Sequence, residues 1–201
     1  MIAAPEQILT RRLLLRKPVP GDARDICATY AGDPEVTRYL QWRPDGSLPA
    51  AEKFLARTLA NWERGTAYTW SILLREDRSF LGMIEARIDA YMVNLGYVIG
   101  RAHWNRGFAT EAVAGACAWA EAEPDVFRIW AVCAADNFAS LRVLEKAGMR
   151  REGPPLARAV FPNIGGAPRE CYSYSLVRDF PVAPEGGAIS GPLNGSGAST
   201  P

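Results

Sequence analysis

The residues best suited to chemistry lie together in residues 97–112, which read YVIGRAHWNRGFATEA. An apolar stretch is followed there by a turn, and a helix is predicted to begin near Thr110, which could cap it. A helix N-terminus offers unpaired backbone N–H groups and the positive end of the helix dipole, which bind phosphate. Gly107 permits a positive φ and close approach of an oxyanion, Ala109 is small, and Arg106 adds a cation. The segment therefore predicts a loop that binds a phosphate or pyrophosphate.

The loop differs from two common phosphate-binding motifs. It lacks the Gly-Lys-Ser/Thr ending of a P-loop and the Gly-x-Gly-x-x-Gly of a dinucleotide fingerprint. Residues 104–109 (Trp-Asn-Arg-Gly-Phe-Ala) resemble instead the pyrophosphate loop of the GNAT acetyltransferase superfamily, and the Trp104 start is similar to the RimJ/RimL-like branch. Asn105 replaces the first Gly of that variant, and Asn adopts left-handed backbone more readily than most residues. The alternative interpretation is a solvated glycine-containing loop before a helix.

Two further segments carry the same resemblance. Residues 137–149 (NFASLRVLEKAGM) predict a short amphipathic helix that ends at Gly148, and they resemble the family's Asn-x-x-Ser segment. At the N-terminus, residues 9–16 and 33–40 look like the opening of RimJ/RimL-like enzymes. The resemblance covers roughly residues 8–180, and its motifs follow one another in the family's order.

The resemblance implies an N-acetyltransferase that moves an acetyl group from acetyl-CoA, its co-substrate, to a primary amine. The acceptor amine, a protein N-terminus or a small molecule, would attack directly in a ternary complex. The edge of the strand at residues 97–99 would pair with the pantetheine arm, whose amides imitate a peptide, and a gap beside that strand would admit the arm. The expected cofactor-binding residues are Tyr97, Val98, Ile99, Trp104, Asn105, Arg106, Gly107, Phe108, Ala109, Thr110, Asn137 and Ser140.

Three residues are candidates for proton transfer. The resemblance implies that Ser140 protonates the departing thiolate, and the structural alternative is a cap of its helix. Alternation along residues 80–89 places Glu85 on the face opposite Ile84 and Ala86, where it could be the base that deprotonates the amine. A cross-strand ion pair with an Arg is the other interpretation of Glu85. Glu170, at the family's usual Asp position, is the second candidate base.

The acceptor itself is not identified by the sequence. By resemblance, selectivity lies in residues 41–46 and 157–168, where Trp42, Arg43, Phe161 and Asn163 would form a partly aromatic and basic mouth. Such a mouth would favour an acceptor that carries a carboxylate or an acidic peptide. Packing or a solvated loop explains the same residues equally well.

Composition excludes several other classes of protein. The 201 residues have 48% hydrophobic content and a net charge of +1, so long-range attraction to nucleic acid or an anionic membrane is not expected. No apolar run reaches membrane-spanning length, and a cytoplasmic protein is expected. The four cysteines, at 27, 117, 133 and 171, have no Cys-x-x-Cys spacing and are interpreted as buried apolar residues. The single histidine, His103, cannot build a metal site with such partners, so no metal is expected.

Hydrophobic periodicity predicts an α/β fold in one domain, residues 1–180. With the resemblance, this means a GNAT-like mixed, mostly antiparallel central sheet flanked by helices. A tail, residues 181–201, is rich in Pro, Gly and Ser and is predicted to be disordered. The expected strands are residues 8–16, 68–75, 80–89, 94–99, 127–133 and a closing pair that ends at 169–177; the expected helices are 21–31, 48–64, 110–122 and 140–147.

A second class of function stays open at this point. Because no catalytic carboxylate is unambiguous, the chain could be a non-catalytic acyl-CoA-binding or sensor protein. A homodimer is also open. Amine-dependent release of thiol from acetyl-CoA would separate the enzyme from the sensor.

Overall fold

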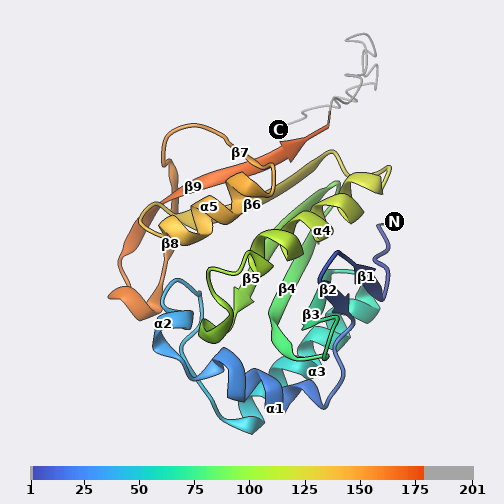
Figure 1. Ribbon diagram of the computed structural model, residues 1–201. Coiled ribbons are helices and arrows are strands. Elements are labelled where there is room, and N and C mark those ends of the chain that lie inside the picture. The colour runs from blue at the N-terminus through green and yellow to red at the C-terminus, as the bar shows by residue number, and fades with distance from the viewer. Residues whose placement is uncertain (1, 179–201) are drawn as a thin grey trace, which may run out of the picture.

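A nine-stranded sheet forms the framework of the molecule (Figure 1). The structure is a computed structural model that describes residues 2–178, with residues 157 and 158 described by their backbone only. The sheet order is β1-β2-β3-β4-β5-β6-β9-β7, and β8 pairs with β9. Every pairing in this described part is antiparallel except that of β5 with β6. The strands are β1 Gln7–Leu9, β2 Leu13–Arg16, β3 Ala67–Leu74, β4 Phe80–Asp89, β5 Met92–Ile99, β6 Arg128–Ala134, β7 Arg150–Arg151, β8 Ala157–Val160 and β9 Pro168–Val177.

Helices cover both faces of this sheet (Figure 1). On one face, α4 and α5 pack on an apolar core that includes Trp70 and Ile84. On the other face, α1 and α3 pack against Phe80 and Met83 of β4. The helices are α1 Asp22–Ile26, continued by a π-helical turn Cys27–Ala31, then α2 Pro34–Thr37, α3 Leu48–Arg64, α4 Phe108–Ala122 and α5 Phe138–Lys146, with 3₁₀ turns at Arg101–His103 and Pro162–Ile164.

Local sequence signals account for the two long helices. Ser47 caps α3 by accepting from the Ala50 N–H, and Gly65 ends it in a left-handed conformation. The expected helix 48–64 is therefore confirmed. Helix α4 is apolar nearly all round and has seven buried residues, as expected for a helix that lies against a sheet.

Residues 8–16, expected as one strand, form the hairpin β1–β2 instead. The chain reverses at residues 10–12, where the Thr10 N–H donates to the Leu13 carbonyl and the Leu13 N–H donates to the Thr10 hydroxyl. Thr10 lies in a run of strand-forming residues, and its hydroxyl supplies a turn bond that hydrophobic periodicity cannot reveal. The strand prediction was wrong at this point, and the turn it missed contacts α4.

The strands β5 and β6 pair for only a short distance. Their parallel register joins Met92–Asn94 to Arg128–Trp130 and stops there. Beyond it, residues 95–99 of β5 stay paired with β4, and residues 131–134 of β6 stay paired with β9. The sheet therefore divides between β5 and β6, which gives the gap that the resemblance implied.

The mixed, mostly antiparallel sheet flanked by helices agrees with the expected fold class. Helix α2 and strands β1 and β7 are short elements that the sequence pattern did not separate, whereas β8 and β9 form the expected closing strand pair. Among residues 2–178, no helix is long and apolar enough to cross a membrane. The predicted tail, residues 181–201, lies outside the described residues.

Candidate active site

The predicted phosphate-binding loop follows directly after β5 and leads into α4. Asn105 and Gly107 both have positive φ, 59° and 75°, so the chain turns sharply on each side of Arg106. Gly107 is the N-cap of α4 and has no side chain to occupy the space before the first turn. The unpaired N–H groups of that turn and the helix dipole there favour an anion. The loop thus has the geometry that its sequence predicts.

Thr110 does not cap this helix, and that expectation was wrong. Helix α4 begins at Phe108, two residues earlier than predicted, which places Thr110 inside the first turn. The N-cap is instead Gly107, in a left-handed conformation. Because glycine has no side chain, the backbone N–H groups of the first turn have no side-chain cap. Phe108 is buried, while Ala109 and Thr110 are half-buried at the start of the helix.

Trp104, the first residue of the loop, connects it to β5, and His103 precedes it. The Trp104 indole N–H donates to the carbonyl of Ile99 at 2.7 Å, and the rest of the side chain is exposed. His103 is half-buried, and its buried Nδ1 has no partner within the described structure. Burial, and then the nearby Arg106, lower the pKa of His103, so the imidazole is neutral at pH 7. His103 therefore lies beside the loop without adding charge to it.

Ser140 lies across the gap from β5 and meets Tyr97. The two hydroxyl oxygens are 2.6 Å apart, and the Tyr97 hydroxyl also lies 3.4 Å from the Ser140 carbonyl. Burial raises the pKa of Tyr97 above its ordinary value, although the bond with Ser140 opposes the shift. The phenol therefore stays protonated at neutral pH. This pair joins residues 43 positions apart, and no sequence signal predicted it.

Asn137, not Ser140, caps α5. The Asn137 side chain accepts from the Ser140 N–H at 3.2 Å, and the helix begins at Phe138. The cap interpretation of Ser140 was therefore wrong, since Ser140 is the third residue of the helix. Its hydroxyl interacts with Tyr97 and also with the thiol of Cys133 on β6, a contact that lowers the thiol pKa against the larger effect of burial, which raises it to about 11.

The candidate base Glu85 lies on the opposite sheet face from Tyr97. In the strand register Glu85 is next to Thr69 on β3 and Gly96 on β5, whereas Tyr97 shares its row with the core residue Ile84. Glu85 forms an ion pair with Arg87, two residues along the same strand, and accepts from Thr69 at 3.4 Å. Gly96 leaves open space beside the carboxylate, because a Cβ there would have nothing nearer than the Arg87 guanidinium at 3.9 Å.

Glu170 lies on β9, separated from Glu85 by β5 and β6. The preceding residue, Arg169, pairs with Asp136 through its guanidinium. The backbone carbonyl of Glu170 accepts from the Ala135 N–H at 3.0 Å. At about 4.8 Å per strand, three strand steps separate the two carboxylates by roughly 14 Å, and the divided sheet adds to this. The structure therefore does not bring the two candidate bases to one place.

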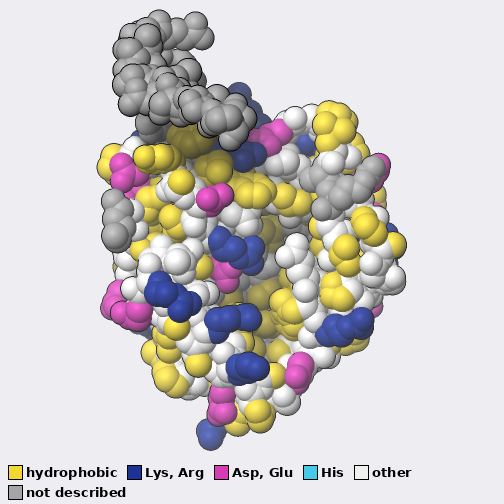
Figure 2. All heavy atoms as spheres, turned by 180° about the vertical axis from the view of Figure 1, so that it is seen from behind, with side chains coloured by type: hydrophobic (Ala, Val, Ile, Leu, Met, Phe, Trp, Pro, Cys, Tyr) yellow, Lys and Arg dark blue, Asp and Glu magenta, His cyan; other side chains and the backbone are white. Residues whose placement is uncertain are grey.

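The segments expected to choose the acceptor do lie together. The Asn163 amide donates to the carbonyls of Thr37 and Trp42, each at 2.7 Å, and Phe161 is buried edge-on against Tyr39. Asn163 thus joins the two segments through the Trp42 carbonyl, and Phe161 packs on Tyr39, just before residues 41–46. Trp42 keeps 40% of its surface exposed. Figure 2 shows the face away from α4 and α5, where Lys and Arg side chains gather beside a hollow with a hydrophobic floor.

Among residues 2–178, no group of three or more His, Cys, Asp or Glu side chains could hold a metal ion. The structure thus places a divided sheet beside the N-terminus of α4, with the hydroxyl groups of Tyr97 and Ser140 at the gap. A family model described as "Acetyltransferase (GNAT) domain" matches residues 12–150. The chain belongs to this family and is an acetyltransferase.

Known relatives and structures agree with this assignment. The chain is similar to the uncharacterized N-acetyltransferase YoaA of Bacillus subtilis (strain 168), with 31% identity over 172 residues, which cover 84% of this chain and 95% of YoaA. Its fold is similar to that of the microcin C7 self-immunity acetyltransferase MccE in complex with acetyl-CoA and AMP (TM-score 0.76, 16% identity, covering 84% of this chain and 94% of that one). It is also similar to that of RimL, the ribosomal L7/L12 alpha-N-protein acetyltransferase, in complex with coenzyme A (TM-score 0.75, 17% identity, covering 86% and 98%).

Proposed function

We propose that this enzyme transfers the acetyl group of acetyl-CoA to a primary amine by direct attack in a ternary complex. The observation that carries the proposal is the gap between β5 and β6, with the anion-binding loop at one side and the Tyr97–Ser140 pair across it. Solved structures of the same fold contain acetyl-CoA or coenzyme A. These features support a binding path for a thioester with a long, amide-bearing arm and a pyrophosphate.

Each part of acetyl-CoA has a counterpart in the chain. The amides of residues 105–110 and the Arg106 guanidinium would hold the pyrophosphate, since unpaired N–H groups and a cation are available there. The edge of β5 at residues 97–99, which has no strand partner on the β6 side, would pair with the pantetheine amides, as an added strand would. Asn137, at the start of α5, would contact the arm. Trp104 and Phe108 would support the loop rather than bind charge.

The reaction needs one proton to leave the amine and one to reach the sulfur. The neutral amine attacks the thioester carbonyl, a C–N bond forms, and the C–S bond breaks to release a thiolate. A backbone N–H at the gap would stabilise the negative carbonyl oxygen. Ser140 would protonate the thiolate and recover its proton from Tyr97, which is protonated at neutral pH and would in turn regain a proton from water. Glu85 would take the amine proton from the opposite sheet face; Glu170 is the second candidate.

The acceptor is proposed only as a class. A protein N-terminus or a small-molecule amine fits the reaction, and the RimL neighbour acts on the α-amino group of a ribosomal protein. Basic side chains on the face in Figure 2 would favour an acceptor that also carries a carboxylate. A panel of amines of both kinds, assayed by release of free CoA thiol, tests the proposal. Amine-stimulated release is expected, whereas acetyl-CoA binding without it would indicate a non-catalytic sensor.

The cofactor loop has its own test in Gly107→Val. Gly107 has a φ of 75°, which a β-branched residue rarely adopts, so the substitution should distort the loop. Acetyl-CoA should raise the Tm of the parent protein, because a ligand that binds only the folded state stabilises it, and this shift should be lost in the variant. A variant that keeps the full shift would contradict the assignment of the loop.

A further inference from the structure

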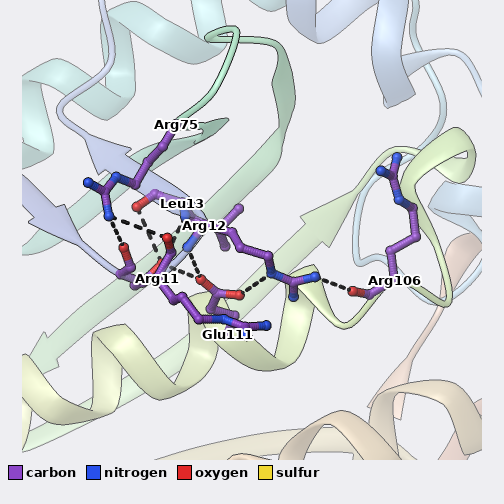
Figure 3. A network of polar contacts seen from close by, with 7 residues as sticks. Arg11, Arg12, Leu13, Arg75, Arg106 and Glu111 are labelled. Atoms are coloured by element: carbon purple, nitrogen blue, oxygen red, sulfur yellow. Dashed lines mark hydrogen bonds and ion pairs between the residues drawn. The ribbon is translucent and has the colours of Figure 1, made fainter.

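Arg12 reaches from the β1–β2 turn to the pyrophosphate loop, more than ninety residues away in the chain. Its Nη1 donates to the carbonyl of Arg106 at 3.0 Å, and its Nε pairs with Glu111 at 2.7 Å (Figure 3). The guanidinium also lies over the ring of Phe108, 4.6 Å from the centroid. Neither the glycine-containing loop nor the helix periodicity indicated a partner in this turn.

Glu111, on helix α4, accepts hydrogen bonds from the β1–β2 turn. Its Oε1 accepts from the Thr10 hydroxyl at 2.7 Å and from the Arg12 backbone N–H at 2.6 Å, while its Oε2 takes the Arg12 guanidinium. Burial opposes the charge on Glu111, but these hydrogen bonds outweigh it and lower the pKa. The carboxylate is therefore ionised at neutral pH and offsets the charge of Arg12.

The bond to the Arg106 carbonyl fixes the direction of one peptide group. In a trans peptide the C=O and the N–H point in opposite directions, and no cis peptide occurs in the described chain. Because the Arg106 carbonyl points to Arg12, the N–H of Gly107 points away from Arg12. An amide aimed in this way is a donor for an anion in front of the loop, at no reorganisation cost when the anion arrives.

We propose that Arg12 and Glu111 are positioning residues that aim the Gly107 amide at the pyrophosphate of acetyl-CoA. This inference rests on the proposed function. Arg12 acts through geometry, because Glu111 neutralises its charge and its Nη1 is engaged by a backbone carbonyl. Direct attraction of Arg12 to the phosphates is the alternative.

The substitution Glu111→Gln separates the two roles by the sign of its effect. If Arg12 acted as a charge, loss of the neighbouring carboxylate would tighten the binding of a polyanion. If the pair positions the loop, the same change should weaken binding, because a glutamine has one acceptor oxygen in place of two and turns an NH2 donor toward one of the Arg12 donors. We expect the Kd of CoA, measured by calorimetry, to rise about tenfold, since a mis-aimed amide loses a charge-assisted hydrogen bond.

Arg12→Lys tests the same point with the charge retained. A lysine ammonium cannot reproduce the planar fork that spans Glu111 and the Arg106 carbonyl, so the Kd should rise here as well. In the Arg12→Lys variant, the KM for acetyl-CoA should rise by a larger factor than kcat falls, because Arg12 and Glu111 are proposed to act at the pyrophosphate and not at the thioester. Glu152→Gln is the matched control: it removes a carboxylate paired with Arg128 at the far end of β5 and should leave the Kd unchanged.

The outcomes are distinct. Weaker CoA binding in both variants, with parent-like binding in Glu152→Gln, supports the positioning role. Tighter or unchanged binding in Glu111→Gln overturns it, as does weakening of equal size in the Glu152→Gln control. If the parent protein binds no CoA, the proposed function fails and this inference fails with it.

Discussion

At the scale of single residues, the Ser140 hydroxyl does not cap helix α5. Because Asn137 caps α5, Ser140→Ala should leave the cap in place and cost little stability. If Ser140 protonates the thiolate, kcat should fall by about 10²–10⁴-fold, the usual range for loss of a general acid. Measurement of kcat, CoA affinity and Tm on one preparation checks this, with binding expected to stay close to that of the parent.

Two variants serve as controls for Ser140. Asn137→Ala should lower stability by about 1 kcal/mol through the lost cap, which shows what a cap defect looks like. Tyr97→Phe removes the hydroxyl 2.6 Å from Ser140 and should lower kcat if the phenol returns the proton. A Ser140→Ala enzyme with normal turnover per folded molecule would contradict the acid role.

The pH dependence of kcat/KM tests which carboxylate is the base. An α-amino group has a pKa near 8 and a lysine near 10.4, so removal of the base is felt most where little free amine exists. Glu85→Gln should therefore depress kcat/KM most near neutral pH, with partial recovery at higher pH. If Glu85 serves only to pair with Arg87, the profile should keep its shape.

Glu170→Gln is the comparison for that experiment. Since the two carboxylates lie on different sides of the divided sheet, a single acceptor cannot use both directly. A changed profile in Glu170→Gln together with an intact one in Glu85→Gln would move the acceptor to the β9 side of the gap.

At the scale of elements, the divided edge between β5 and β6 leaves strand backbone without a ladder partner. Backbone amides in residues 95–99 and in residues 131–134 should therefore exchange hydrogen faster than those in Met92–Asn94 and Arg128–Trp130, where β5 and β6 pair with each other. If the pantetheine arm pairs with β5, CoA should slow exchange in residues 95–99. Hydrogen exchange followed by mass spectrometry, with and without CoA, measures this.

Strand β3 is the internal reference for exchange, because it pairs on both sides, with β2 and β4. Its protection should be high and should change least when CoA is added. Equal slowing throughout the sheet would indicate general stabilisation instead of pairing at the gap.

The elements that the sequence predicted well are those with a local cause. Helix α3 has its cap, its proline and its terminal glycine in the sequence, and the β4 alternation places Glu85 opposite Ile84. The turn before α4 was predicted from Gly107, because a positive φ favours glycine, and Asn105 also has a positive φ, which Asn adopts more readily than most residues. The Tyr97–Ser140 and Arg12–Glu111 contacts join distant segments, and their residue types are common elsewhere, so no local pattern predicts them.

At the scale of the whole molecule, carboxylates held in ion pairs make the free energy of unfolding fall at acid pH. Burial would raise the pKa of Glu152, but the bonds from Arg128 and two serines outweigh it and lower the pKa to about 2, from 4.5. The stabilisation by Glu152 is therefore complete above about pH 4.5 and is lost as the pH falls toward 2. The pKa values of Asp22 and Glu111 are lowered as well, with the same sign of effect on stability.

The Tm of the parent should therefore fall steeply below about pH 4.5. Glu152→Gln should be less stable than the parent at neutral pH and should lose less of its Tm between pH 4.5 and pH 2. Glu52→Gln, at an exposed position on α3, should follow the parent curve. Identical slopes for the parent and Glu152→Gln would contradict this source of acid sensitivity.

The short junction of β5 and β6 also has a mechanical consequence. Only Met92–Asn94 and Arg128–Trp130 join the two halves of the sheet there, so we expect the halves to rotate relative to each other about this junction. The five residue steps from Asn94 to Ile99 make an arm of about 17 Å, and a rotation of about 3° about the junction moves its end by about 1 Å. That distance is comparable with the rise of one methylene group in an acyl chain. We therefore expect the backbone pairing at this junction to set the width of the opening at the other end.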